Sequence, residues 1–238
     1  MEQENNETQN SRRGFIGTGL KLAVIAGIAG LGFMPSCKDK EDGEDKEVSP
    51  PEDLMQEHGL LNRVLLVYDT CRSHLINNES FDKGALYNAA GIIKTFVEDY
   101  HEKQEEDYLF PRFKKAAVLT DLVDVLLQQH RAGRNITAEL LQLSKNKDTT
   151  DSEKQRIIIL LTSFNTMYRP HEAREDTVLF PAFRKIVSQH EYDSLGEDFE
   201  KNEQKRFGKK GFEMMVDKVA TIEKTLGIYE LAQFTPKL

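Results

Sequence analysis

The chain has 238 residues, of which 39% are hydrophobic and 30% are charged, and its formal net charge at pH 7 is -8. This length suffices for one well-buried domain with additional segments, and the polarity excludes an integral membrane protein. The negative charge leaves no basic surface to neutralise phosphates and no nucleic-acid-binding motif occurs, so we expect no nucleic-acid partner. The two cysteines, Cys37 and Cys71, cannot build a disulfide framework and form no Cys-x-x-Cys motif.

Residues 1–36 are predicted to be an export signal. The pair Arg12-Arg13 precedes a weakly apolar stretch, residues 20–34, that is too short for a comfortable transmembrane helix. The segment resembles a bacterial twin-arginine export signal, with a Sec signal or an uncleaved anchor as the alternatives. A twin-arginine route carries folded proteins, which suits a protein that loads its cofactor before export. We therefore expect a periplasmic or membrane-anchored protein.

Cys37 follows the apolar stretch and is followed at once by charged residues. The sequence Met34-Pro35-Ser36-Cys37 resembles a lipoprotein processing site, although Met34 and Pro35 match the usual pattern poorly. The alternatives are a free Cys37 or a disulfide with Cys71. Residues 37–51 are acidic, and we expect them to form a flexible linker. Contact with a membrane is then expected only through the signal segment or a lipid at Cys37.

From residue 52 onward, apolar residues recur three and four positions apart with few Gly or Pro, which predicts helices almost throughout. Short polar loops between long helices make neighbouring helices antiparallel. We predict an all-α, up-down-up-down four-helix bundle over residues 52–185 and a C-terminal helical extension over residues 186–238. The first helix, which begins near residue 52, shows its buried side at residues 60–68. Further helices are expected at about 84–110, 116–144, 151–180, 188–206 and 209–226. Thr150 and Glu153 supply capping groups for the helix that starts at 151.

A fifteen-residue motif occurs twice, as HEKQEEDYLFPRFKK at 101–115 and HEAREDTVLFPAFRK at 171–185, 70 residues later. A single His-x-x-x-Glu pair is weak evidence, because it could be a solvated contact on a helix surface. Two copies that share Leu-Phe-Pro and the following Phe indicate a duplicated structural unit. Within each copy, His and Glu lie one turn apart on the same helix face, so both can reach one metal site.

Two further histidines, His58 and His130, repeat with a similar offset of 72 residues. The chain order is therefore His, His-x-x-x-Glu, His, His-x-x-x-Glu, one element per predicted helix. At about 1.5 Å per residue, His58 and the two motif histidines lie at a similar depth in an antiparallel bundle. If the third helix starts at Ala116, His130 lies deeper in the bundle than the other three histidines. This difference in depth is the weakest point of the predicted site.

The predicted metal ligands are the histidines and glutamates of this pattern: His58, His101, Glu105, His130, His171 and Glu175. His74 and His190 have no repeat counterpart, and we expect neither to bind metal. Imidazole and carboxylate ligands in a helical bundle favour iron, with Mn or Zn as alternatives, and the absence of thiolates argues against Cu(I) or structural Zn. Eight aromatic residues are predicted to form core that keeps the site dry: Phe96, Tyr100, Phe110, Phe113, Phe164, Tyr168, Phe180 and Phe183.

The paired motifs resemble the hemerythrin-like, His-His-Glu cation-binding family over about residues 54–185. The resemblance implies two metal ions, with the four histidines as terminal ligands and Glu105 and Glu175 as bridging carboxylates. Oxygen-carrying hemerythrins have a second His where this chain has Arg134, so the ligand pattern is closer to the repair-of-iron-centres branch. They also have an Asp that would correspond to Asp176, but repeat symmetry favours Glu175 as the bridge, since Asp176 is rotated off the ligand face.

Three functions fit this pattern. The first is an exported di-iron protein that binds or reduces oxygen, peroxide or nitric oxide at open coordination positions, with an electron donor that the sequence does not identify. The second is repair of iron-sulfur centres, against which stand the predicted export and the lack of a preceding Cys-x-x-Cys domain. The third is non-enzymatic holding of iron or another divalent metal. Whether the protein is an enzyme stays open at this point.

Overall fold

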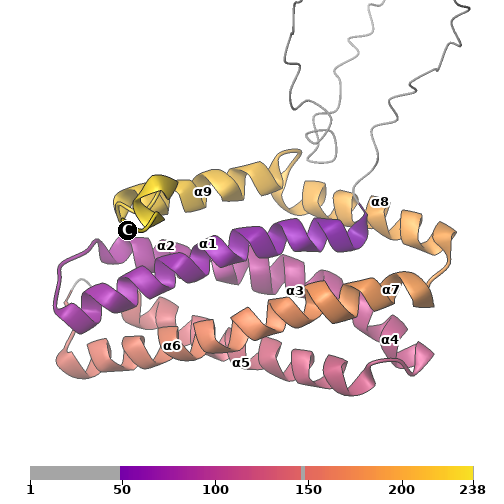
Figure 1. Cartoon of the computed structure of the whole chain (residues 1–238), viewed down its shortest axis with the longest axis horizontal. Helices are drawn as coiled ribbons and strands as arrows, with labels where there is room; N and C mark the ends of the chain where they lie inside the picture. Colours follow the sequence, from indigo (N-terminus) through magenta and orange to yellow (C-terminus); the bar gives the residue numbers. More distant parts are fainter. Residues whose placement is uncertain (1–48, 146–147, 238) are drawn as a thin grey trace, which may run out of the picture.

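The computed structural model describes residues 49–145 and 148–237. The predictions about the export signal, Cys37 and nearly all of the linker fall outside these residues. Every regular element in the described part of the chain is helical, and no β-strand occurs there (Figure 1). The predicted all-α fold is confirmed.

Four long helical segments follow one another along the chain and pack side by side (Figure 1). The first is α1 (Pro50–Asn77), and the third is α5 (Thr120–Ser144). The second is built from consecutive pieces, α2 (Lys83–Ile92), η2 (Ile93–His101), α3 (Glu102–Gln104), η3 (Glu105–Leu109) and α4 (Phe110–Ala116). The fourth consists of α6 (Asp151–Arg174), η4 (Glu175–Leu179) and α7 (Phe180–Ile186). α1 and α5 each contact both α2 and α6, which closes the bundle.

Side-chain caps fix the starts of α1 and α6. Thr150 accepts a hydrogen bond from the backbone amide of Glu153, whose side chain accepts one from the Thr150 amide, as the sequence predicted. Ser49 and Glu52 form the same box at α1. The residues Pro50-Pro51, expected to end the linker, instead form the first turn of α1 and are buried. Proline is tolerated there because a residue of the first turn needs no partner for its amide.

Three predicted helix boundaries are wrong. The second and fourth segments do not stop at Phe110 and Phe180 but continue to Ala116 and Ile186. The third helix begins at Thr120, four residues later than predicted, because residues 117–119 form the connection and two of them have positive φ. This later start reduces the depth of His130 in the bundle to about ten residues from the helix start.

The Leu-Phe-Pro motifs mark a π-helical turn in each repeat. Proline lacks an amide and clashes with the carbonyl four residues earlier, so it normally ends or kinks a helix. Here the amide of Phe110 donates to the carbonyl of Glu105, five residues back, and the equivalent bond joins Phe180 to Glu175. We infer that the wider turn accommodates each proline and lets the helix continue.

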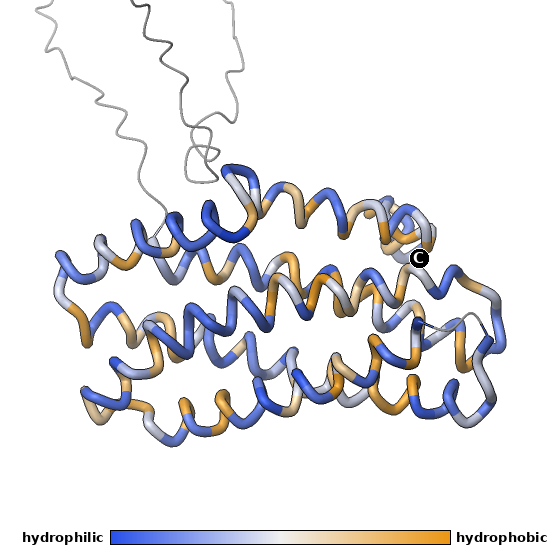
Figure 2. The backbone as a smooth tube through the Cα atoms, turned by 180° about the vertical axis from the view of Figure 1, so that it is seen from behind, coloured by the Kyte–Doolittle hydropathy of each residue, from blue (hydrophilic) through white to orange (hydrophobic). Residues whose placement is uncertain are grey.

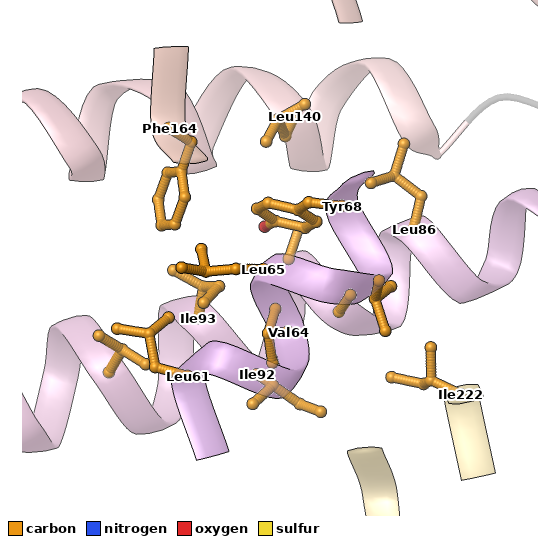
Figure 3. Packing of buried hydrophobic residues seen from close by; sticks show 14 of the residues in the cluster. Leu61, Val64, Leu65, Tyr68, Leu86, Ile92, Ile93, Leu140, Phe164 and Ile222 are labelled. Atoms are coloured by element: carbon orange, nitrogen blue, oxygen red, sulfur yellow. The ribbon is translucent and has the colours of Figure 1, made fainter. Parts of the chain in front are cut away.

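The apolar core consists of two clusters. Every helix of the bundle carries hydrophobic residues interspersed with hydrophilic ones (Figure 2). In the larger cluster, Tyr68 packs edge-on against Phe164 with ring centroids 5.3 Å apart, among aliphatic residues of α1, α2 and α5 (Figure 3). The smaller cluster contains Leu54, Phe113 and Phe183. All eight aromatic residues predicted for the core are buried.

The C-terminal extension packs along one side of the bundle, next to α1 (Figure 1). It consists of α8 (Gln189–Phe207), α9 (Gly211–Thr225) and the short 3-10 helix η5 (Leu231–Phe234). Phe199 of α8 is buried in the smaller cluster and Val219 of α9 in the larger one. Among the described helices, none combines the length and apolar character needed to cross a membrane.

Candidate metal centre

The six predicted ligands lie in a polar layer between the two apolar clusters. All are buried, with no more than 4% of any residue exposed: His58, His101, Glu105, His130, His171 and Glu175. They come from four different helical segments. Burying this many ionisable groups is costly unless each finds a partner.

The Nε2 atoms of all four histidines point toward the two glutamates. His58 Nε2 lies 3.4 Å from Glu175 Oε2, and His101 Nε2 lies 3.8 Å from Glu105 Oε2. In the other half of the bundle, His130 Nε2 lies 3.4 Å from Glu105 Oε2. His171 Nε2 lies 3.2 Å from Glu175 Oε1. Each glutamate therefore faces histidines of both halves.

The Nδ1 atom of each histidine donates outward to a side chain of another helix. The four bonds are His58 to Asp176 (2.7 Å), His101 to Glu57 (2.7 Å), His130 to Glu106 (3.1 Å) and His171 to Gln129 (2.9 Å). A proton on Nδ1 leaves the Nε2 lone pair available, which is the tautomer that a metal ion needs.

These outer partners repeat with the ligands, although none of them was among the predicted ligands. Glu57 and Gln129 each precede one of the single histidines, and Glu106 and Asp176 each follow one of the glutamates. The repeat offsets alone could have identified them. Asp176 bonds the outer nitrogen of His58, so Glu175 is the residue that faces the inside of the layer.

Phenylalanines of the Leu-Phe-Pro motifs cover two of the imidazoles. Phe180 stacks on His58 with centroids 5.6 Å apart and planes at 17°, and Phe110 stacks on His130 at 5.6 Å and 26°. Each ring covers a histidine contributed by a different helical segment. Each π turn therefore contributes both a ligand and an apolar ring that covers the site.

The two halves differ in the residues just outside the ligands. Arg134 Nη2 lies 2.7 Å from a carboxylate oxygen of Glu102 and 2.7 Å from one of Glu106. At the equivalent position of the other half, Asn62 donates to Glu172 at 2.6 Å. Arg134 therefore binds carboxylates on the outer side of His130 and supplies no ligand to the inner layer.

Two groups of ligand atoms are close enough to hold a cation each. His58, His101 and Glu105 form one, and Glu105, His130, His171 and Glu175 form the other, with atoms within 4.8 Å of one another in each group. A third group, Glu102, Glu106 and His130, lies where Arg134 already binds both carboxylates. Glu105 is common to the first two groups.

The unpaired atoms of this layer fit a metal site. Both oxygens of Glu105, both of Glu175 and Nε2 of His130 are buried and have no hydrogen-bond partner within the described residues. Burial and the charge of Glu175 raise the pKa of Glu105. His58 Nε2 and His101 Nε2 face each other at 3.2 Å, where two lone pairs require a proton or a cation between them. Bound cations would satisfy all these atoms together.

The other histidines and the described cysteine lie elsewhere. His74 pairs with Glu79 at 3.0 Å and His190 is exposed, so neither joins the layer. Cys71 is a free thiol buried in the larger apolar cluster, where burial raises its pKa to about 12.

A helical bundle with a buried His and Glu layer of this order defines a cation-binding bundle protein. Residues 49–196 match the Hemerythrin HHE cation binding domain, and the chain belongs to this family. Proteins of Mycobacterium bovis and Mycobacterium tuberculosis, both described as uncharacterized, are each 40% identical over 227 residues, covering 90% of this chain and 89% of theirs. No solved structure matches the chain.

Proposed function

We propose that the chain is an exported di-iron protein that binds or reacts with oxygen, peroxide or nitric oxide. The observation that carries the proposal is the set of four buried carboxylate oxygens, unpaired within the described residues, that face four imidazole nitrogens. Such a set is costly without bound cations, because each carboxylate and lone pair is removed from water.

The proposed roles follow from which atoms lie together. In this proposal His58 and His101 hold one ion, and His130 and His171 hold the other. Glu105 belongs to both groups of ligand atoms, and Glu175 would contribute to both ions because its Oε2 also lies 3.4 Å from His58 Nε2. Nitrogen and oxygen donors suit iron, with Mn or Zn as alternatives. When bound, iron would supply one-electron chemistry and positions open to a small molecule. The outer carboxylates keep the histidines oriented for this purpose.

The surroundings restrict the size of what can react. Phe110 and Phe180 stack on the histidines, and the apolar clusters lie on either side of the layer. This packing favours a ligand of two or three atoms over a large substrate. An external donor would have to supply electrons for any net reduction.

Repair of iron-sulfur centres is the second candidate. Its support is Arg134, which stands where oxygen-carrying hemerythrins have an additional histidine and which binds Glu102 and Glu106 instead. Metal holding without catalysis is the third. Iron that transfers readily to a metal-free iron-sulfur protein would favour repair, whereas iron that stays bound through cycles of oxidation favours the first proposal.

The experiment is metal analysis of the chain lacking residues 1–36, with visible spectra before and after exposure to oxygen and nitric oxide. We expect about two iron ions per chain, as in two-metal sites. Glu105→Ala and Glu175→Ala should each lower bound iron to half or less, because both ions lose a ligand and shared charge compensation. His74→Ala and His190→Ala are the controls and should leave the iron content unchanged. Wild-type iron content in both glutamate variants would refute the shared site.

A further inference from the structure

An apolar groove on the bundle surface leads to one of the ligands. It lies between α5 and α6, has a volume of about 350 Å³, and includes Leu122, Val125 and Leu126 of α5 and Pro170 of α6 in its lining. Its inner end is formed by His171 and its outer partner Gln129. Val125 is 49% exposed, so the groove opens to solvent.

The equivalent surface in the other half is covered. The positions 72 residues before the α5 lining and 70 before the α6 lining are buried except for Ser49, which is partly exposed. The buried ones above the ligand are Pro50, Asp53, Leu54, Glu57, Tyr100 and Gln104. Helix α8, which has no counterpart in the repeat, covers them, since its Phe199 packs with Leu54 and its Phe207 contacts Tyr100. A cavity of about 360 Å³ on this side is lined by Tyr100 and Gln104 but not by His101.

The histidines beneath the two surfaces are equally buried, each 4% exposed, so the difference lies in the residues above them. His101 donates to Glu57, a carboxylate that is 1% exposed, and breaking this bond would cost a buried hydrogen bond to a charged group. His171 donates to Gln129, a neutral and partly exposed amide. Gln129 can exchange this bond for water at a small cost.

We propose that the groove between α5 and α6 is the access route for a small uncharged molecule, oxygen or nitric oxide, with Gln129 as its gate. The ion that this molecule reaches is the one held by His130 and His171. The lining also includes Asp121 and Arg174, two exposed side chains of opposite charge, but its other side chains are apolar apart from Gln129 and His171. A charged ligand would lose hydration along these apolar side chains, which favours an uncharged diatomic. The nature of the ligand rests on the proposed function, whereas the one-sided access is a property of the chain itself.

The first test uses the metal-free protein, in which diethyl pyrocarbonate modifies accessible histidines and peptide mass spectrometry follows each site. His171 should be modified faster than His101. Val125→Trp fills the groove and should slow modification of His171 by about tenfold, a modest added barrier, without changing His101. Ile159→Trp, on α6 outside the groove and 53% exposed, is the matched control and should change neither rate. Equal rates at His101 and His171, or no effect of Val125→Trp, would overturn the route.

The second test uses the iron-loaded protein and the rate of the absorbance change caused by nitric oxide. Val125→Trp should lower this rate by about tenfold at unchanged iron content, and Ile159→Trp should behave like the wild type. Gln129→Glu copies the covered side and should also slow the reaction. A wild-type rate in Val125→Trp would overturn the proposal. A wild-type protein that holds iron but never responds to nitric oxide or oxygen would overturn the proposed function and the diatomic ligand, while the modification rates still decide whether the groove reaches His171.

Discussion

Each histidine of the site is a buried base whose charge depends on its surroundings. Burial lowers the pKa of His101 to about 4, so this ring is neutral at pH 7. Burial also opposes the charge on His130, but the charge of Glu102 and the adjacent carboxylates of Glu105 and Glu106 outweigh it and raise the pKa of His130 to about 10. The metal-free layer thus holds a proton on His130 that a metal ion must displace, so binding should release protons.

The raised pKa of His130 makes the metal-free protein less stable at high pH. A folded-state pKa above the unfolded value of 6.5 gives a stabilisation that is complete below pH 6.5 and is lost as pH rises toward about 10. The melting temperature of the metal-free protein should fall between pH 7 and pH 9.5, by about 2–4 °C for each kcal/mol lost. His130→Phe should show a smaller fall, and His74→Phe should match the wild type. Equal falls in all three proteins would contradict the assignment.

The helices are shaped to fit the site. The π turns beginning at Glu105 and Glu175 combine a ligand, a covering phenylalanine and a proline within seven residues. On the neighbouring helix α5, Gly133 lies against Tyr168 of α6, whose hydroxyl donates to Glu102 at 2.6 Å. A Cβ at position 133 would overlap the Tyr168 hydroxyl.

Gly133→Ala should therefore destabilise the protein although alanine favours helices. We expect a loss of about 1–3 kcal/mol in the free energy of unfolding, because the tyrosine must move from its bond with Glu102. Gly59→Ala, in α1 with nothing within 4 Å of the added Cβ, should instead be stabilising by about 0.5–1 kcal/mol. Urea unfolding of the metal-free variants measures both. Similar effects at the two positions would show that the close packing of α5 on Tyr168 does not matter.

At the scale of the whole molecule, a duplicated bundle is combined with an unduplicated extension. Phe199 of α8 is fully buried against the bundle, whereas Phe234 near the C-terminus is 47% exposed. Phe199→Ala should cost about 3–5 kcal/mol in the free energy of unfolding, and Phe234→Ala should cost little. Two separate unfolding transitions in the wild type would instead mean that the extension is an independent unit.

Export is the part of the proposed function that depends on residues outside the described ones. Replacing Arg12 and Arg13 by Lys should retain the precursor in the cytoplasm, because recognition of a twin-arginine signal depends on the arginine pair and not on charge alone. Cell fractionation measures this, and unchanged export would indicate another route. If Cys37 carries a lipid, Cys37→Ser should release the exported protein from membranes.

The sequence alone determined the fold class and the residues that gather in the inner layer. Helical structure follows from local periodicity, and the caps formed by Thr150 and Glu153 also depend only on neighbouring residues. The ligand residues could be predicted because the duplication repeats the same residue types in two copies, with offsets of 70 and 72 residues. That these residues hold iron remains a proposal.

The tertiary structure decided what depends on residues far apart in the chain. His58 and Asp176 are separated by 118 positions, and no local pattern pairs them. The π turns were not predicted, because a proline locally indicates a helix end. Burial of the phenylalanines that follow, Phe113 and Phe183, favours continuation of each helix beyond its proline. The repeat could not predict that α8 covers one half of the bundle, since the extension has no second copy. Periodicity fixes which face of a helix is buried, and only packing decides which partner buries it.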